Sequence, residues 1–244
     1  MRKFGLIGYP LSHSFSKKYF TDKFEQERIK DCVYDIYPIE NIAQLPALLK
    51  NNPTLEGLNV TIPYKEQVLP YLSQQAEIVQ KTGACNCIKI AGSKLTGYNT
   101  DVAGFEQSLT KYLQPDHKRA LVLGTGGAGK AVEYVLKKLK IRYKYVSRKP
   151  SVKNLSYEQL TADVIAAHTL IINSTPLGMY PNITQAPPIP YHSLTPAHYL
   201  FDLIYNPAKT LFLQKGEEHG AVIQNGLDML IVQAEESWKI WNSE

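Results

Sequence analysis

The sequence predicts an α/β fold in two domains, one of them with a mixed sheet. Short apolar runs of strand length alternate with helical patterns along the whole chain, which is typical of α/β layers. Two strand-like runs are separated only by Ala91-Gly92-Ser93, which indicates an antiparallel hairpin. A glycine-rich turn also joins an apolar run to a helix in the second half. The 244 residues have room for one large domain or two modest ones.

The first domain is expected to cover residues 1–100. The strand-like runs before the hairpin are Lys3–Gly8, Cys32–Ile36 and Gly57–Val60, and the helical patterns among them are Phe15–Arg28 and Ile42–Lys50. The hairpin pairs Cys85–Ile90 with Lys94–Tyr98, and a helix at Val102–Tyr112 follows it. Because no long Gly/Ser linker marks the boundary, it is inferred from the strand pattern alone.

The second domain, expected over residues 101–225, shows the same alternation. Its strand-like runs are Ala120–Leu123, Arg142–Val146, Leu170–Asn173, Tyr199–Leu203 and Val222–Gln224. Six prolines lie between the third and fourth of these runs, and we expect them to exclude regular structure there. An amphipathic helix at Leu227–Trp241 closes the chain.

The glycine-rich turn is Gly124-Thr125-Gly126-Gly127-Ala128-Gly129, between an apolar strand and a helix. We expect Gly124 to permit the turn, Gly126 to let the backbone approach a pyrophosphate, and Gly129 to let the helix pack closely on the strand. The phosphates would then lie on unpaired N–H groups at the helix N-terminus. A bare glycine pattern also fits an ordinary turn, but the strand and helix on either side favour a Rossmann-like dinucleotide site.

The next strand ends in Ser147-Arg148-Lys149, where an NAD site usually carries a carboxylate for the ribose hydroxyls. No Asp or Glu lies between Glu133 and Glu158. A guanidinium suits a 2′-phosphate, so the sequence favours NADP over NAD. The alternative is that Arg148 merely extends a solvated basic face, formed by Lys137, Lys138, Lys140 and Lys144.

The net charge of +5 could suggest nucleic-acid binding. Much of the excess, however, lies between Lys137 and Lys153, beside the expected cofactor phosphates. Because no basic stripe with interleaved aromatic residues is visible, we expect no nucleic-acid partner.

The apolar runs are too short to cross a bilayer, so we expect no membrane partner. The N-terminal run is interrupted by Gly8 and Pro10, which argues against a signal peptide. Cys32, Cys85 and Cys87 have no further ligands at metal-binding spacing, so we expect no metal and reduced thiols in the cytoplasm.

Four segments carry polar groups that a purely structural sequence would not need: Gly8–Ser16, Asn59–Lys65, Gly83–Asn86 and Tyr98–Asp101. One serine would suffice to cap the helix after the first strand, so Ser14 and Ser16 fit recognition of an oxygen-rich ligand equally well. Thr61 and Lys65 follow a strand end, where ligands of α/β sheets bind, although a lone lysine is usually a solvated surface residue. Asp101 by itself could be only a helix N-cap.

Taken in register, these segments resemble the shikimate dehydrogenase family. The matching segments are HSxS (His13 to Ser16), NVTxPxK (Asn59 to Lys65), GAxN (Gly83 to Asn86), NTD (Asn99 to Asp101) followed by Gly104, GxGGAG (Gly124 to Gly129), NSTPLGM (Asn173 to Met179), DLIYNP (Asp202 to Pro207) and GLDMLIVQ (Gly226 to Gln233). The resemblance covers essentially the whole chain. It implies a substrate domain and a Rossmann-like NADP domain with a cleft between them, the C-terminal segment 226–244 packing back on the first domain.

The resemblance also implies an activity, the reversible reduction of 3-dehydroshikimate to shikimate with NADPH in chorismate and aromatic amino acid biosynthesis. The implied substrate contacts come from Ser14, Ser16 and Tyr205 to the carboxylate, from Thr61, Asn86 and Gln233 to the ring hydroxyls, and from Lys65 and Asp101 at the reacting C3 oxygen. The implied cofactor contacts come from Gly124, Thr125, Gly126, Gly127 and Ala128 at the pyrophosphate, from Ser147, Arg148 and Lys149 at the adenosine end, and from Leu203 and Gly226 near the nicotinamide.

The chemistry agrees with the implied catalytic pair. Hydride transfer to a ketone builds negative charge on oxygen, which an ammonium at Lys65 stabilises and can protonate, while Asp101 orients the lysine and balances its charge. Positioned acid–base help of this kind typically supplies about 10²–10⁴-fold in rate. The residues leave open which of the two makes the proton transfer, and we favour Lys65.

The chain departs from the family at the adenosine end, where Ser147-Arg148-Lys149 replaces the usual Asn-Arg-Thr. The arginine is retained, but adenine-side hydrogen bonding is put in doubt. Two alternatives stay open: a quinate/shikimate dehydrogenase with relaxed cofactor use, and a catalytically silent nucleotide-binding relative. The resemblance fits both a monomer and a homodimer.

Overall fold

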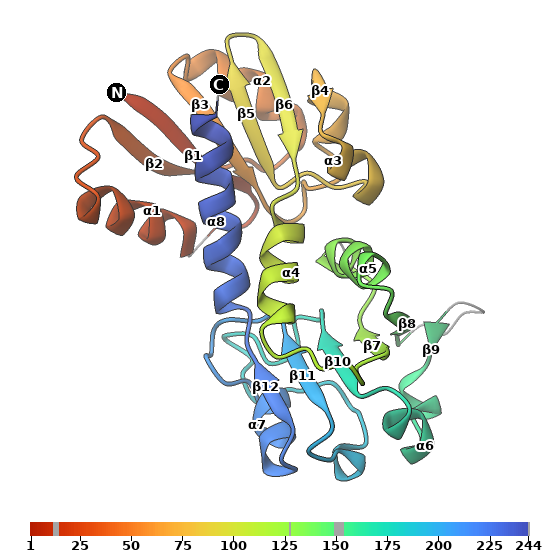
Figure 1. Cartoon of the computed structure of the whole chain (residues 1–244). Coiled ribbons are helices and arrows are strands. Elements are labelled where there is room, and N and C mark those ends of the chain that lie inside the picture. The colour runs from red at the N-terminus through yellow and green to blue at the C-terminus, as the bar shows by residue number, and fades with distance from the viewer. Residues whose placement is uncertain (12–14, 127, 149–153, 244) are drawn as a thin grey trace. The chain divides into compact units, whose positions relative to one another are not determined.

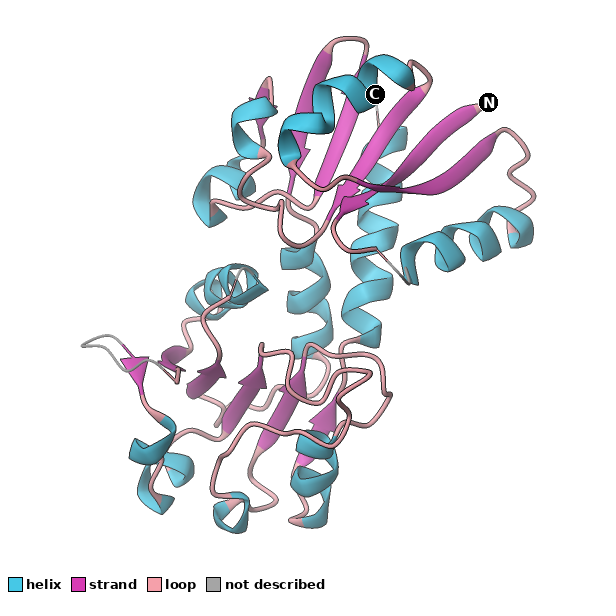
Figure 2. Ribbon diagram, turned by 180° about the vertical axis from the view of Figure 1, so that it is seen from behind, coloured by secondary structure: helices cyan, strands magenta, loops and turns pink. Residues whose placement is uncertain are grey.

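The computed structural model describes residues 1–11, 15–126, 128–148 and 154–243 (Figures 1 and 2). The chain divides into two compact units. Unit 1 contains Met1–Thr100 and Ala234–Glu244, and unit 2 contains Asp101–Gln233. The C-terminal helix α8 (Leu227–Asn242) therefore begins in unit 2 and ends in unit 1.

Unit 1 is built on a six-stranded sheet with the order β2-β1-β3-β5-β6-β4. The strands are β1 (Arg2–Gly8), β2 (Cys32–Pro38), β3 (Leu55–Val60), β4 (Gln74–Gln75), β5 (Cys87–Ala91) and β6 (Lys94–Tyr98). β1 runs parallel to β2 and β3, whereas β5 is antiparallel to both β3 and β6. The mixed sheet expected from the hairpin is thus confirmed.

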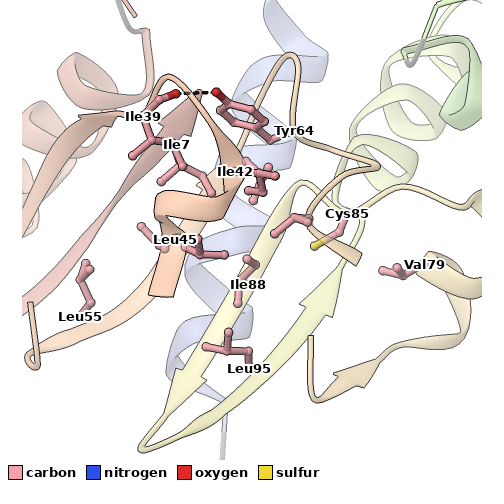
Figure 3. Close-up of a cluster of buried hydrophobic side chains, with 13 residues drawn as sticks. Ile7, Ile39, Ile42, Leu45, Leu55, Tyr64, Val79, Cys85, Ile88 and Leu95 are labelled. Carbon is pink, nitrogen blue, oxygen red and sulfur yellow. Dashed lines mark hydrogen bonds between the residues drawn. The ribbon is translucent and has the colours of Figure 1, made fainter. Parts of the chain in front are cut away.

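Helices cover both faces of this sheet (Figures 1 and 2). They are α1 (Phe15–Gln26), α2 (Leu45–Asn51), α3 (Glu77–Thr82) and the end of α8. Alternation along β1 sends Phe4 toward α1 and α8, where it stacks on Trp241 with ring centroids 4.9 Å apart. Ile7 belongs to the opposite core, under α2, which Figure 3 shows.

The helix expected over Ile42–Lys50 is a 3₁₀ turn (Ile42–Gln44) followed by α2. The Asn41 side chain accepts a hydrogen bond from the Ala43 amide and so caps the 3₁₀ turn. Pro46 lies in the first turn of α2, where its missing N–H costs no helical hydrogen bond. The expected single helix is therefore wrong at its first turn.

Unit 2 has a six-stranded sheet in which every described pair is parallel, with the order β12-β11-β10-β7-β8-β9. The strands are β7 (Arg119–Leu123), β8 (Arg142–Val146), β9 (Asn154–Leu155), β10 (Leu170–Asn173), β11 (Tyr199–Asp202) and β12 (Val222–Gln224). Counted within the unit, the order is 6-5-4-1-2-3, that of the dinucleotide-binding Rossmann fold. The strand order reverses between β7 and β10, where such folds bind their ligands.

The helices of unit 2 are α4 (Asp101–Thr110), α5 (Ala128–Lys138), α6 (Ala162–Ala166), α7 (Leu211–Glu218) and the start of α8. The proline-rich segment between β10 and β11 contains one 3₁₀ turn, Tyr191–Ser193. Tyr191 packs on the core of the unit and donates its hydroxyl proton to the Pro187 carbonyl at 2.8 Å. The expectation of no regular structure is therefore wrong at this turn. Among the helices of the described residues, none has both the length and the apolarity to cross a membrane.

Gly57 on β3 makes room for the end of α8. A Cβ at this position would overlap the Trp241 ring, which is 3% exposed and held by a hydrogen bond of 3.0 Å from its Nε1 to the Ile88 carbonyl. Gly57→Ala should therefore lower the free energy of unfolding by about 1–3 kcal/mol through overpacking. Chemical denaturation measures the loss. Gly126→Ala is the control, because its Cβ would meet no described atom within 4 Å; equal stabilities for the two variants would contradict the prediction.

Candidate active site

The loop after β3 fixes the backbone on both sides of Lys65. The Thr61 amide donates to the Ile7 carbonyl at 3.0 Å, and the Lys65 carbonyl accepts from the Cys85 amide at 2.8 Å. Between them, Tyr64 is 2% exposed, and its hydroxyl donates to the Ile39 carbonyl at 2.5 Å (Figure 3). Lys65, half-buried, is thus held at the carboxyl end of β3 by a buried neighbour.

Asn86 lies beside this loop, because its carbonyl accepts a hydrogen bond from the Val60 amide at 2.8 Å. Its side chain is 3% exposed and is held by Thr100: the Thr100 amide donates to Oδ1 at 2.7 Å, and Nδ2 donates to Thr100 Oγ1 at 3.0 Å. Three of the predicted substrate residues, Thr61, Lys65 and Asn86, are therefore brought together at one end of the sheet.

Ser16 is buried in the first turn of α1, the helix that follows β1. The resemblance placed Ser14 beside it at the substrate carboxylate, but Ser14 lies outside the described residues. Its position therefore remains a prediction.

Asp101 and Gln233 lie on neighbouring helices of unit 2 (Figures 1 and 2). A Cβ on Gly104 would lie 2.5 Å from the Met229 carbonyl oxygen and 3.3 Å from the Gln233 Cβ, so a glycine is needed for α4 and α8 to approach this closely. Gly104 comes about one turn after Asp101, the first residue of α4. A carboxylate at this helix N-terminus is favoured by the helix dipole.

Asp101 is assigned to unit 2 and Lys65 to unit 1. Each is held within its own unit, and their action as an acid–base pair remains a prediction.

The glycine turn between β7 and α5 has the backbone that a pyrophosphate site needs. Gly124 has φ +97°, which favours glycine, and a Cβ there would lie 2.8 Å from Thr175. A Cβ on Gly126 would meet no described atom, so its backbone faces open space, as does the exposed Thr125. Gly127 lies outside the described residues, and Ala128 begins α5. These features fit a dinucleotide pyrophosphate at the N-terminus of α5.

Gly129 does not have the expected role of close helix–strand packing. A Cβ there would lie 3.6 Å from the Tyr145 ring, an ordinary contact. Glu133 instead joins α5 to β8, because the hydroxyls of Tyr143 and Tyr145 donate to its two carboxylate oxygens at 2.7 and 3.0 Å.

At the end of β8, the Ser147 amide donates to the Leu155 carbonyl of β9 at 2.9 Å, and Arg148 is exposed. Lys149 lies outside the described residues. Two lysines of the basic stretch are ion-paired on helix surfaces, Lys137 with Glu133 at 2.6 Å and Lys138 with Glu106 at 2.8 Å. For these two, the interpretation as a solvated face fits better than a phosphate contact.

Leu203 and Gly226, both predicted near the nicotinamide, contact each other. A Cβ on Gly226 would overlap the Leu203 backbone, and the Gly226 amide donates to the Ile204 carbonyl at 3.0 Å. Tyr205, predicted at the substrate carboxylate, follows on the same loop and is 36% exposed.

A carboxylate that the sequence did not single out holds this loop. Asp202 is fully buried and accepts hydrogen bonds from Asn173 Nδ2 at 3.0 Å, the Ile204 amide at 3.0 Å and Thr210 Oγ1 at 2.6 Å. It thus joins the ends of β10 and β11 to the start of α7. Burial raises the pKa of Asp202 to about 6, although the three hydrogen bonds act in the opposite direction.

Comparison with known proteins agrees with this architecture. Residues 6–88 match the model of the shikimate dehydrogenase substrate binding domain. Over 99% of its length the chain is 34% identical to the NADP(+) shikimate dehydrogenase of Caldicellulosiruptor saccharolyticus, of which 92% is covered. The chain belongs to the shikimate dehydrogenase family. The predicted fold class, two α/β domains with a Rossmann-like NADP domain, is confirmed.

Solved structures of the family superpose on the whole chain. The chorismate mutase/shikimate 5-dehydrogenase fusion protein of Clostridium acetobutylicum is 35% identical, with a TM-score of 0.88 over 99% of this chain and 91% of that one. The Thermus thermophilus enzyme, solved in complex with NADP(H) and shikimate, is 27% identical, with a TM-score of 0.87 over 99% of this chain and 94% of that one.

Several buried polar residues that form hydrogen bonds to the segments of the predicted site were not predicted from the sequence. They are Tyr34, Asn59, Thr100, Asp202 and Ser237, all buried. Asn59, Thr100 and Asp202 lie inside the segments that carry the family resemblance, which was a signal that could have found them. Tyr34 and Ser237 lie in strand and helix patterns that indicate only core packing.

The raised pKa of Asp202 predicts how stability changes with pH. An unfolded aspartate releases its proton near pH 4, but the folded protein retains it to about pH 6, so stability falls as the pH rises through this window, by about 3 kcal/mol in total. Asp202→Asn should lack this slope, and the stability difference between wild type and variant should shrink from pH 4 to pH 6.5. Denaturant titrations across that range measure it, with the exposed Asp163→Asn as control; a difference independent of pH would argue against the assignment.

Proposed function

We propose that the protein catalyses the reversible reduction of 3-dehydroshikimate to shikimate with NADPH, a step of chorismate and aromatic amino acid biosynthesis. The observation that carries this proposal is the likeness over both units to a relative named for this activity, at 34% identity over 99% of the chain. The Rossmann strand order and the open backbone at Gly126 support a dinucleotide cofactor, and the relative's name, which specifies NADP(+), supports NADP.

The substrate is bound by residues of both units. Ser14, Ser16 and Tyr205 hold its carboxylate, and Thr61, Asn86 and Gln233 hold its ring hydroxyls. The hydrogen bonds that fix Asn86 and the burial of Ser16 support these roles, because side chains held in one rotamer lose little entropy when they bind a ligand.

Lys65 and Asp101 act at the reacting C3 oxygen. NADPH supplies the hydride when bound. As the carbonyl carbon is reduced, the Lys65 ammonium stabilises the charge on the oxygen and gives it a proton, so that the ketone becomes a hydroxyl. Asp101, the first residue of α4, orients the lysine and balances its charge.

The cofactor contacts follow the geometry of unit 2. Gly124 to Ala128 hold the pyrophosphate, Ser147 to Lys149 the adenosine end with its 2′-phosphate, and Leu203 and Gly226 lie near the nicotinamide. The protein acts as a monomer or a homodimer in the cytoplasm, with its three cysteines as free thiols.

The direct test is oxidation of shikimate by the purified protein with NADP, followed by the absorbance of the reduced nicotinamide. Quinate as alternative substrate and NAD as alternative cofactor complete the comparison. A protein that reduces neither cofactor with shikimate would be a catalytically silent relative, and equal efficiency with quinate and NAD would identify the broader dehydrogenase.

Lys65→Ala should lower kcat for shikimate oxidation by about 10²–10⁴-fold and change KM for shikimate only modestly, because the ammonium acts at the charge that develops in the transition state. Steady-state kinetics measure both constants. Lys50→Ala, on an exposed position at the end of α2, is the matched control. A Lys65 variant with near-normal kcat would remove this residue from the mechanism.

Arg148→Ala should raise KM for NADPH by about 10–100-fold, the loss expected for a charge-assisted hydrogen bond to phosphate, and leave KM for NADH almost unchanged. Arg142→Ala is the control, because Arg142 is also exposed and begins the strand that Arg148 follows. If both cofactors weakened equally, the 2′-phosphate role of Arg148 would be wrong.

A further inference from the structure

A network of hydrogen-bonded side chains links several elements of unit 1 and ends at the predicted substrate residues Ser16 and Asn86. It begins at Ser16 on α1, which is hydrogen-bonded to the Tyr34 hydroxyl on β2. The Tyr34 hydroxyl donates to Asn59 Oδ1 on β3 at 2.9 Å. These three residues come from three different elements, so the contact exists only in the folded protein.

The hydrogen-bond network continues from Asn59 to Asn86. Asn59 Nδ2 donates to Ser237 Oγ on α8 at 3.0 Å and to the Asn86 carbonyl at 3.3 Å. Ser237 Oγ lies 3.2 Å from Thr100 Oγ1, and Thr100 in turn holds the Asn86 side chain. Asn86 is thus fixed at its backbone by Asn59 and at its amide by Thr100.

The direction of these bonds is set by the Asn86 carbonyl. A carbonyl only accepts, so Nδ2 of Asn59 must face it, and Oδ1 must face Tyr34. Tyr34 therefore donates to Asn59 and accepts from Ser16. Burial raises the pKa of Tyr34 well above that of a free phenol, although the Ser16 hydrogen bond opposes the rise, so the phenol keeps the proton that it donates.

The side chains of this hydrogen-bond network are buried away from solvent. Ser237 is fully buried, and Tyr34, Asn59, Thr100 and Asn86 are each at most 4% exposed. Polar groups in such surroundings hold one another firmly, because a lost partner leaves a buried donor or acceptor unsatisfied. Two other buried hydroxyls, those of Ser108 and Tyr199 in unit 2, have no hydrogen-bond partner among the described residues and provide matched controls.

We infer that Ser237 and Tyr34 are positioning residues for shikimate binding, which act through Asn59 and Thr100 on Asn86; this role rests on the proposed function, in which Asn86 holds a ring hydroxyl. Neither residue is assigned a contact with substrate or cofactor. Ser237 supports Thr100 from α8, and Tyr34 fixes the amide of Asn59 from β2. Removing either hydroxyl frees the Asn86 amide to leave the orientation in which it meets the ring.

The decisive variants are Ser237→Ala and Ser237→Cys, measured against Ser108→Ala. Alanine removes the hydroxyl, whereas cysteine keeps a group at the γ position, slightly larger than the hydroxyl, that forms only weak hydrogen bonds. Both should raise the Kd and KM for shikimate about tenfold, the effect of one well-placed hydrogen bond, while kcat changes less than about threefold and KM for NADP stays unchanged. Titration calorimetry below the unfolding temperature, together with steady-state kinetics, gives these constants.

The outcomes separate this role from others. Wild-type affinity in both Ser237 variants, or in Ser237→Cys alone, would overturn it, since the latter result would mean that only packing matters. A fall in kcat with unchanged Kd would also overturn it. If the wild-type protein itself neither binds nor oxidises shikimate, the proposed function fails, and the positioning role falls with it.

A second measurement tests whether Tyr34 and Ser237 belong to one coupled hydrogen-bond network. Tyr34→Phe and Ser237→Ala each release the Asn59 amide, so the double variant should lose less in its thermal unfolding midpoint than the sum of the two single losses. Tyr199→Phe replaces Tyr34→Phe in a control cycle and should give additive losses with Ser237→Ala. Additive losses in both cycles would show that Tyr34 and Ser237 are independent.

Discussion

The close approach of α8 to its neighbours, at one glycine in each unit, is the constraint that fixes the residues carried by this helix. In unit 2, Gly104 lets α4 lie against Met229 and Gln233. In unit 1, Gly57 lets β3 lie against Trp241. A methyl group at either glycine would meet an atom that has little freedom to move, a helix carbonyl in one case and a buried indole in the other. One helix is therefore held at both ends by contacts that only a glycine permits.

This constraint explains how one helix serves two kinds of chemistry. Gln233 and Ser237 are four residues apart and so lie on the same side of α8. Gln233 has a proposed contact with a ring hydroxyl, whereas Ser237 contacts Asn59 and Thr100 in the interior of unit 1. A shift of α8 would disturb both. The tight fit at Gly57 and Gly104 thus preserves the geometry of a hydrogen-bond network that has little tolerance for displacement.

The sequence predicted what depends on local pattern. The strand alternation, the hairpin and the glycine turn each depend on neighbouring residues, and the fold class followed from them. Short helices such as α3 and α6 were not predicted, because one turn or two of apolar pattern is not distinguishable from a loop. Gly129 was misinterpreted, since whether a Cβ fits there depends on Tyr145, sixteen positions away. The glycine turn, Arg148 and the polar segments were found from the residues themselves, whereas the roles of the substrate residues came from the family resemblance.

The buried residues that hold the site segments could not be predicted from the sequence, because their roles depend on contacts between distant positions. Asn59 and Ser237 are separated by 178 positions, and a serine in an amphipathic helix carries no sign of its partner. Asp202 lies inside a segment of the family resemblance, but its burial could not be predicted, since a carboxylate after an apolar run is usually solvated. Its burial is known only once Asn173 and Thr210 are seen to enclose it.

The two units satisfy their buried polar groups in different ways, and this difference has a consequence for pH. The network of unit 1 consists of hydroxyls and amides, and its one titratable member, Tyr34, is kept neutral by burial. The network of unit 2 is centred on Asp202, whose charge changes near pH 6. The hydrogen bonds of the unit 1 network therefore do not change with pH in this range, whereas the loop that carries Leu203 and Tyr205 is held by a buried carboxyl group that folding favours in its protonated form. As the pH rises through about 6, Asp202 loses its proton in buried surroundings, so this loop of unit 2 loses stability while the polar interior of unit 1 is unaffected.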